Sequence, residues 1–270
     1  MTAAPPLIPR SLLFVPGNRP ERFEKACASG ADLVCIDLED AVAPGEKAHA
    51  REAAVKFLRG TGHAHVSLRC NAPGTAEIEA DLRAAAGLEL PFLMVPKVDT
   101  VGDIEALDTD LPLIPVIESG MAVLNAASIM AHPRVRMALF GGGDYSADLG
   151  VPMSFEAFHY ARSHLAACSA AFEVPVFDVP YLDVHDVEGG EADTRRVAGL
   201  GIHSRAAIHP LQVAAIHAAY APSEEDVAAA FDLRAAYEAS GGNAALHRGK
   251  LIEAPMLRAA ERTIARSERS

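Results

Sequence analysis

The chain has 270 residues, a net charge of −12 and a hydrophobic fraction of 50%. This length fits one large α/β domain or two small ones, and the apolar content supplies a sizeable buried core. Because 36 acidic residues outnumber 24 basic ones, we expect no nucleic acid and no anionic membrane surface as a partner. An anionic small molecule then needs a locally positive pocket.

Targeting and redox signals predict a cytoplasmic soluble protein. The N-terminus MTAAPPLIPR lacks the basic region and apolar stretch of a secretion signal. No apolar run approaches the roughly 20 residues that span a bilayer. The cysteines Cys27, Cys35, Cys70 and Cys168 match no zinc spacing, so we expect buried thiols in a reducing compartment.

Short apolar runs alternate with helix-forming segments as far as about residue 220. The predicted strands are Leu12–Val15, Leu33–Ile36, His65–Leu68, Phe92–Val95, Leu113–Ile117, Met137–Phe140, Val174–Phe177 and Ala206–Ile208. The predicted helices are Arg19–Ala28, Gly45–Leu58, Thr75–Ala86, Val101–Leu107, Met121–Ala131, Phe155–Ala171, Glu191–Leu200 and a last one that ends near Tyr220. Continuous apolar strands are typical of a parallel sheet covered on both faces.

Eight strands that alternate with helices predict a (β/α)8 TIM barrel. An open doubly wound sheet is the alternative. No linker or charge block interrupts the pattern, so we expect a single domain over residues 1–270. The barrel would occupy about 1–220 and a C-terminal helical extension about 221–270. This extension contains a helix capped by Ser223, a Gly241-Gly242 break and a final helix.

The active site of such a barrel lies at the C-terminal ends of its strands. Polar residues at those ends are Asn18, Arg19, Asp37, Glu39, Asp40, Arg69, Asn71, Lys97, Glu118, Asp144, Asp178, Asp183 and His209. Any single one could instead cap a helix or lie in a surface turn. For His209 a capping or core role is the preferred interpretation, because magnesium prefers oxygen ligands.

Glu118 and Asp144 differ from the others because each follows an apolar strand and neither has a basic neighbour in sequence. Neighbouring parallel strands deliver both carboxylates to one edge. Two hard oxygen ligands, completed by water and substrate oxygens, are how Mg²⁺ is usually held. Gly141–Gly143 are expected to adopt positive φ and to approach a ligand closely. A nucleotide loop is disfavoured, since the pattern GxxxxGK[ST] is missing.

Arg69 offers a planar fork that suits a substrate carboxylate. The alternative is an ion pair with Asp37 or Glu39 on the adjacent strand, and the two interpretations are not exclusive.

Several segments resemble one known family. They are RSLLFVPGNRPERFEKACASGADLVCIDLEDAVAPGEKAHAR, SLRCNAPGT, FLMVPKV, PVIESGMAVLNA, LFGGGDYSADLG, FDVPYLDVHDVEG and RAAIHPLQ. The chain resembles the citrate lyase β-subunit-like proteins of the HpcH/HpaI aldolase family over nearly its whole length. The resemblance implies a (β/α)8 barrel, dependence on Mg²⁺ and a homo-oligomer, a trimer or hexamer. It also implies that Arg69 binds the substrate carboxylate and that Glu118 and Asp144 bind the metal.

One segment departs from the family pattern. Relatives that act on malyl-CoA-type substrates carry an aspartate in a segment resembling GKMIDAP, which acts from a neighbouring subunit. Here the segment is GKLIEAP, and Glu253 stands in place of that aspartate with one more methylene. The resemblance implies a catalytic role for Glu253 and favours a free-standing enzyme over an obligate citrate lyase subunit.

The implied reaction is cleavage or formation of a β-hydroxyacyl-CoA thioester such as citryl-, malyl- or citramalyl-CoA, with a keto acid and an acetyl thioester on the other side. Asp37, Glu39 and Glu253 are the candidates for proton transfer, and nothing in the sequence chooses among them. Arg69, Glu118, Arg19 and Lys97 are the candidates for substrate binding, the last two for the CoA phosphates by position alone. Three alternatives stay open: a class II pyruvate-type aldolase acting on free hydroxy-keto acids, a non-catalytic β subunit in a citrate lyase complex, and a metal- and metabolite-binding protein without turnover.

Overall fold

The computed structural model describes residues 8–60 and 64–268. The chain divides into two compact units, Met1–His217 and Ala218–Ser270, close to the expected boundary near residue 220. Whether the two behave as a single domain stays a prediction. The first seven residues of MTAAPPLIPR, on which the expected absence of a secretion signal rests, lie outside the described residues.

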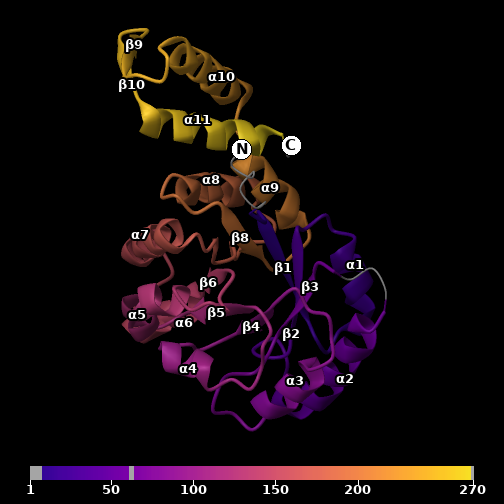
Figure 1. Cartoon of the computed structure of the whole chain (residues 1–270). Helices are drawn as coiled ribbons and strands as arrows, with labels where there is room; N and C mark the ends of the chain where they lie inside the picture. The colour runs from indigo at the N-terminus through magenta and orange to yellow at the C-terminus, as the bar shows by residue number, and fades with distance from the viewer. Residues whose placement is uncertain (1–7, 61–63, 269–270) are drawn as a thin grey trace. The chain divides into compact units, whose positions relative to one another are not determined.

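The first unit contains a closed barrel of eight parallel strands in chain order (Figure 1). The strands are β1 (Ser11–Pro16), β2 (Leu33–Asp37), β3 (Val66–Arg69), β4 (Leu93–Val95), β5 (Leu113–Ile117), β6 (Ala138–Phe140), β7 (Val176–Asp178) and β8 (Ser204–Ala207). β1 pairs with β8, and Leu12 lies opposite Ala206. This pairing closes the sheet, so the predicted TIM barrel is confirmed and the open sheet is excluded.

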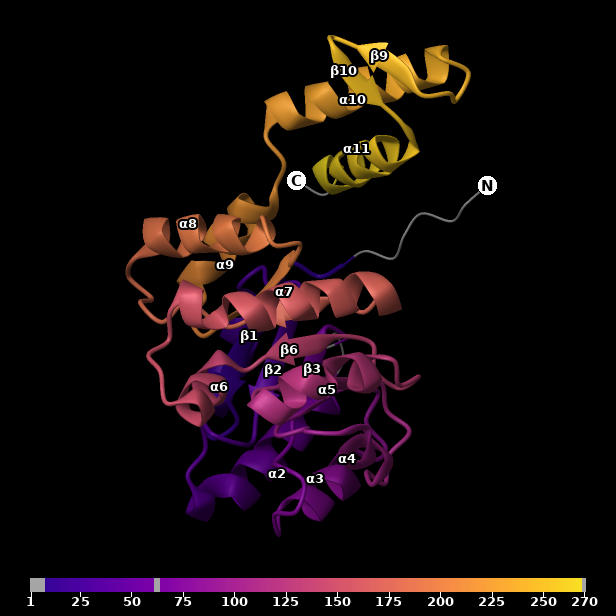
Figure 2. The same ribbon diagram turned by 90° about the vertical axis from the view of Figure 1, so that its left-hand side faces the viewer.

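Helices surround the barrel (Figures 1 and 2). They are α1 (Phe23–Cys27), α2 (Lys47–Leu58), α3 (Ile78–Ala85), α4 (Val101–Glu105), α5 (Gly120–Met130), α6 (Gly142–Leu149), α7 (Phe155–Phe172), α8 (Val187–Ala198) and α9 (Leu211–Tyr220), with short 3-10 turns η1 (Pro20–Arg22) and η2 (Pro44–Glu46). Every residue of β2 and β5 is buried, as expected for strands covered on both faces. Cys35, Met94, Ile114 and Phe177 belong to one apolar core cluster.

The glycines Gly141–Gly143 correct one expectation. None of them has a positive φ, and Gly142 and Gly143 begin α6, a helix that the sequence pattern did not predict because glycine is a poor helix former. A Cβ atom at Gly141 would lie 2.4 Å from Cβ and 2.6 Å from Oε2 of Glu118. Glycine is therefore needed here so that the Glu118 side chain can pack against the backbone.

The second unit consists of α10 (Glu224–Ala239), α11 (Ala254–Ser267) and a hairpin of β9 (Ala245–His247) and β10 (Lys250–Ile252). Ser223 caps α10 as expected, because its side chain accepts a hydrogen bond from the backbone N–H of Asp226. Ala230, Ala260 and Ile264 form a small apolar core between the two helices. Among the described residues, no helix is long and apolar enough to cross a membrane.

Candidate active site

Arg69, the last residue of β3, forms a two-point ion pair with Asp37, the last residue of β2. Nε donates to Oδ1 at 2.7 Å and Nη2 donates to Oδ2 at 2.6 Å. The two residues are register partners in the sheet, so the strand pairing itself brings the side chains together. The predicted ion pair is thereby confirmed. Asp37 uses two of the five guanidinium N–H groups and leaves three on Nη1 and Nη2.

The Asp37 carboxylate also organises the turn that follows β2. Its Oδ1 accepts a hydrogen bond from the backbone N–H of Glu39 at 2.9 Å, and its Oδ2 accepts one from Ala41 at 3.1 Å. Together with Arg69, four donors engage the two oxygens, which is about the full acceptor capacity of a carboxylate. Asp37 therefore fixes both the conformation of this turn and the orientation of the Arg69 guanidinium.

Glu39 lies between the two cations of the site. Its Oε2 is 3.1 Å from Nη1 of Arg69, and its Oε1 is 3.7 Å from Nζ of Lys97. Oε2 is buried and has no partner in hydrogen-bonding geometry, so the contact with Arg69 is an ion pair alone. Burial raises the pKa of Glu39 above its ordinary value, although the charges of Arg69 and Lys97 oppose the shift.

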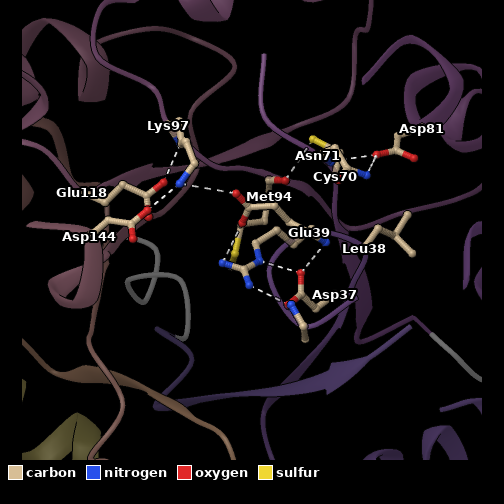
Figure 3. A network of polar contacts seen from close by, with 12 residues as sticks. Asp37, Leu38, Glu39, Cys70, Asn71, Asp81, Met94, Lys97, Glu118 and Asp144 are labelled. Carbon is tan, nitrogen blue, oxygen red and sulfur yellow. Dashed lines mark hydrogen bonds and ion pairs between the residues drawn. The ribbon is translucent and has the colours of Figure 1, made fainter. Parts of the chain in front are cut away.

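Lys97 follows β4 and contacts three acidic side chains, those of Glu39, Glu118 and Asp144. Its φ of 53° is left-handed, a conformation that L-residues rarely adopt. Its backbone N–H donates to Oε1 of Glu118 at 2.6 Å, and its ammonium donates to Oδ2 of Asp144 at 2.5 Å. Figure 3 shows Lys97 with Glu118 and Asp144 on one side and Glu39 on the other. Lys97 was expected near the CoA phosphates, but here its ammonium lies among carboxylates.

Glu118 and Asp144 meet as the strand order predicts, but in different surroundings. Glu118 follows β5 and is buried, whereas Asp144 lies in the first turn of α6 with a side chain that is 46% exposed. Burial raises the pKa of Glu118 to about 7, with further contributions from the charges of Glu39 and Asp144. A cation beside these carboxylates would relieve that cost.

The donor set fits a magnesium ion. Among the residues that the structure describes, no three His, Cys, Asp or Glu side chains form a complete metal site. Mg²⁺ is commonly held by one or two carboxylates, with water and substrate oxygens completing the octahedron. The ammonium of Lys97 on Asp144 shows that this cluster already accepts a cation.

Four other strand-end candidates lie outside this cluster. Asp178 is fully buried in an ion pair with Arg162 of α7. Asp183 accepts backbone N–H groups of its own turn. His209 accepts from the backbone N–H of Leu211, so its capping interpretation is confirmed. Arg19 is exposed at the start of η1.

Glu253 belongs to the second unit. It is the N-cap residue of α11, its side chain makes no capping hydrogen bond, and it is exposed. Its expected catalytic role stays a prediction.

Sequence reasoning missed a half-buried lysine behind the site. Lys47 is the first residue of α2, and its ammonium donates to the backbone carbonyls of Leu38 and Glu39 and to Oδ1 of Asn71. Asn71 is in turn held by Asp81. A basic residue at the N-terminus of a helix was the available signal, because the helix dipole disfavours a cation there.

The fold and the site together define a (β/α)8-barrel protein with an anchored arginine and a cation-binding carboxylate cluster at its strand ends. The chain belongs to the HpcH/HpaI aldolase/citrate lyase family, whose model matches residues 10–210. The family resemblance expected from the sequence is thereby confirmed.

Individual relatives match nearly the whole chain. It is 32% identical to the L-malyl-CoA/β-methylmalyl-CoA lyase of Cereibacter sphaeroides, over 98% of this chain and 96% of that protein. It is 33% identical to the (3S)-malyl-CoA thioesterase of the same species, over 96% and 94%. A crystal structure of CitE from Mycobacterium tuberculosis, in complex with magnesium, acetoacetate and coenzyme A, has a TM-score of 0.87 at 33% identity and covers 96% of this chain and 98% of that one.

Proposed function

We propose that the protein is a Mg²⁺-dependent carbon–carbon lyase that cleaves or forms a β-hydroxyacyl-CoA thioester of the citryl-, malyl- or citramalyl-CoA type. The observation that carries this proposal is the meeting of an anchored arginine, Arg69, with the cation-accepting cluster of Glu39, Glu118 and Asp144. The similarity to a malyl-CoA lyase and to a CitE structure that contains magnesium and coenzyme A supports the cofactor and the substrate class.

Glu118 and Asp144 would hold the magnesium ion, with water and substrate oxygens as its remaining ligands. Bound there, the ion would polarise the hydroxyl and nascent carbonyl oxygens and stabilise negative charge on them.

Arg69 would pair with the substrate carboxylate. Asp37 occupies the Nε and Nη2 edge of the guanidinium, so the N–H groups that remain on Nη1 and Nη2 form the edge available to a second carboxylate. Because Asp37 fixes the plane of the guanidinium, little side-chain entropy is lost when the substrate binds.

Glu39 is the barrel residue best suited to accept the hydroxyl proton. Its pKa is raised by burial, and a base is most effective when its pKa approaches the working pH. Asp37 is less suited, because four donors already engage its oxygens. Glu253 remains an alternative carboxylate. Loss of the hydroxyl proton breaks the bond between the α and β carbons, and the keto acid leaves with an acetyl-thioester enolate that then takes a proton.

A thioesterase is the second candidate, because one relative of similar identity is a (3S)-malyl-CoA thioesterase. The products distinguish the two reactions, since a lyase leaves the thioester intact and a thioesterase releases a free thiol.

The test is to incubate the pure protein with Mg²⁺ and a panel of hydroxyacyl-CoA thioesters and free hydroxy-keto acids. Keto acid is measured by hydrazone formation and free thiol by a chromogenic disulfide, each with and without EDTA. Keto acid from a thioester, without thiol and only with metal, supports the lyase. Thiol release favours the thioesterase, turnover of free acids favours an aldolase, and inertness towards every substrate favours a non-catalytic partner or a metabolite-binding protein.

We also propose that the protein is a cytoplasmic homo-oligomer, a trimer or hexamer, with Arg19 as a candidate partner of the CoA phosphates. All four cysteines are free thiols, and Cys35, Cys70 and Cys168 are buried. This supports a reducing compartment. Light scattering of the purified protein tests the oligomeric state, and an Arg19→Ala variant with a higher KM for the thioester than for the free acid would support the phosphate contact.

A further inference from the structure

We infer that Lys47 is a positioning residue for catalysis, acting at the end of a partly buried chain of hydrogen bonds, the relay, that fixes the backbone of Glu39. This inference rests on the proposed function, in which Glu39 handles the proton. The relay comprises Arg51 and Lys47 of α2, Asp81 of α3, and Asn71, which follows β3.

The outer half of the relay fixes the orientation of one amide. Nε of Arg51 donates to Oδ1 of Asp81 at 2.6 Å, and Asp81 is 2% exposed. The other carboxylate oxygen, Oδ2, accepts from both the backbone N and the side-chain Nδ2 of Asn71 at 2.7 Å each. An ionised carboxylate only accepts hydrogen bonds, so it holds the NH2 group of Asn71 and turns Oδ1 away from itself. Figure 3 shows this pairing of Asn71 with Asp81 beside the Glu39 turn.

The inner half of the relay is the Lys47 ammonium. It donates to Oδ1 of Asn71 at 2.5 Å, to the carbonyl of Leu38 at 3.0 Å and to the carbonyl of Glu39 at 2.9 Å. Three acceptors match the three N–H groups of an ammonium, and none of them is a carboxylate. Lys47 is also the first residue of α2, where the helix dipole disfavours a positive charge. A conflict of this kind is expected at a functional position.

Glu39 is consequently held on both sides of its Cα atom. Its N–H donates to Asp37, and its carbonyl accepts from Lys47 and from the backbone N–H of Val42. The backbone therefore sets the direction of the Glu39 side chain. Displacement of a reacting group by about 1 Å can lower a rate on the order of 10²-fold. Arg69, by contrast, is fixed by Asp37. Loss of the ammonium should therefore act on kcat and spare substrate binding.

The test compares Lys47→Met with Lys56→Met, an exposed lysine on the same helix. We expect Lys47→Met to lower kcat on the order of 10²-fold, with KM and the calorimetric affinity for a keto acid changed less than about threefold, and Lys56→Met to change neither. Hydrogen–deuterium exchange at the amides of Glu39 and Ala41 should become faster in Lys47→Met and stay unchanged in Lys56→Met. Asp81→Asn weakens the relay without removing the lysine. It should lower kcat about tenfold, again with little change in KM and faster exchange at Glu39 and Ala41. This variant replaces Lys47→Met if Lys47→Met does not fold.

Two outcomes would overturn the inference. One is unchanged kcat and unchanged exchange in the variant that folds. The other is a parallel loss of kcat, keto-acid affinity and melting temperature, which would indicate that the substitution destabilises the whole fold. If the wild-type protein cleaves no thioester, the proposed function fails, and the exchange of Glu39 and Ala41 still decides whether Lys47 fixes this turn.

Discussion

Two arginine–aspartate pairs in the barrel share one geometry and differ in their surroundings. Arg69 and Asp37 are joined by bonds of 2.7 and 2.6 Å, and Arg162 and Asp178 by two bonds of 2.8 Å. In both pairs, Nε and Nη2 of the arginine donate hydrogen bonds to the two oxygens of one carboxylate. The Arg162 side chain is 3% exposed and lies against the rings of Phe155 and Phe158, whereas the Arg69 side chain is 14% exposed and lies over Phe14.

The difference lies in what the remaining N–H groups meet. The Arg162 pair is almost fully enclosed, and the Arg205 guanidinium lies 3.7 Å from the same carboxylate, so we expect this pair to contribute to the fold alone. Nη1 of Arg69 lies 3.1 Å from Oε2 of Glu39, at the strand ends where we propose that a substrate acid binds. Under the proposed function, an ion pair at a strand end acquires a chemical role from the groups next to it. Variants at the two pairs should therefore separate loss of activity from loss of stability.

Glu118→Ala should have the largest effect on activity. Removing one of the two proposed metal ligands should lower Mg²⁺-dependent turnover at least about 10³-fold, the scale of a lost electrostatic group. The melting temperature should not fall, because the change removes a buried carboxylate whose pKa is already raised by burial. Keto-acid release and thermal unfolding provide the two measurements, with exposed Glu105→Ala of α4 as the control. Full activity in this variant, or in wild-type protein with excess EDTA, contradicts the metal site.

Arg162→Met should affect stability more strongly than any other change proposed here. Breaking this pair from one side removes both hydrogen bonds to Asp178 and leaves its buried charge opposite the Arg205 guanidinium, 3.7 Å away. The free energy of unfolding should therefore fall by about 3 kcal/mol, the lower end of the range for a broken buried pair. Chemical denaturation measures the change. Arg196→Met is the matched control, since Arg196 lies over the same Phe155 ring but is paired at the surface with Glu156, a contact worth under about 1 kcal/mol. Similar losses in both variants would show that the buried pair has no special weight.

Gly141→Ala should disturb the metal-binding side without removing any ligand. The new Cβ atom would meet the Glu118 side chain at 2.4 Å, so either the strand end or the carboxylate has to move. A shift of this size should lower turnover on the order of 10²-fold. Gly143→Ala is the control, because a Cβ atom there meets nothing within 4 Å and lies inside α6, where alanine is favoured. Equal activity in both variants would contradict the close packing of Glu118.

Much of the fold could be predicted from the sequence, because strands buried on both faces are continuous apolar runs and are therefore easily recognised. All eight strands and the order of the barrel follow from that signal. α6 could not be predicted, because it begins in a run of glycines, which are poor helix formers. A Cβ atom at Gly141 would collide with Glu118, and one at Gly142 would collide with Phe158. The start of α8 at Val187 was missed by four residues, because Gly189 and Gly190 weaken the helical pattern.

The sequence indicated which residues lie at the candidate site better than it indicated which of them contact one another. Strand ends in a barrel converge, so Arg69, Glu118 and Asp144 could be found by position. Whether an acid at a strand end faces the mouth depends on what packs beside it, and the sequence gives Asp178 and Asp37 the same appearance. The Lys97 ammonium contacts Asp144 of α6, and the Lys47 ammonium contacts the turn after β2. Partners such as these depend on three-dimensional packing, so the sequence around each lysine does not identify them.

Arg69→Lys should give the smallest loss and the most specific one. A lysine keeps the positive charge beside Asp37 but cannot present two parallel N–H groups to a substrate acid. We therefore expect KM to rise about tenfold while kcat falls less than threefold. A tenfold change in KM corresponds to about 1.4 kcal/mol, close to the contribution of one charge-assisted hydrogen bond. Steady-state kinetics with a dicarboxylate-derived thioester measures the split, and Arg83→Lys on the exposed face of α3 is the control. Arg162→Lys, at the enclosed pair, should instead lower the melting temperature and leave KM unchanged. A change in KM under twofold in Arg69→Lys would instead assign both pairs to the fold, and the substrate acid would need another anchor.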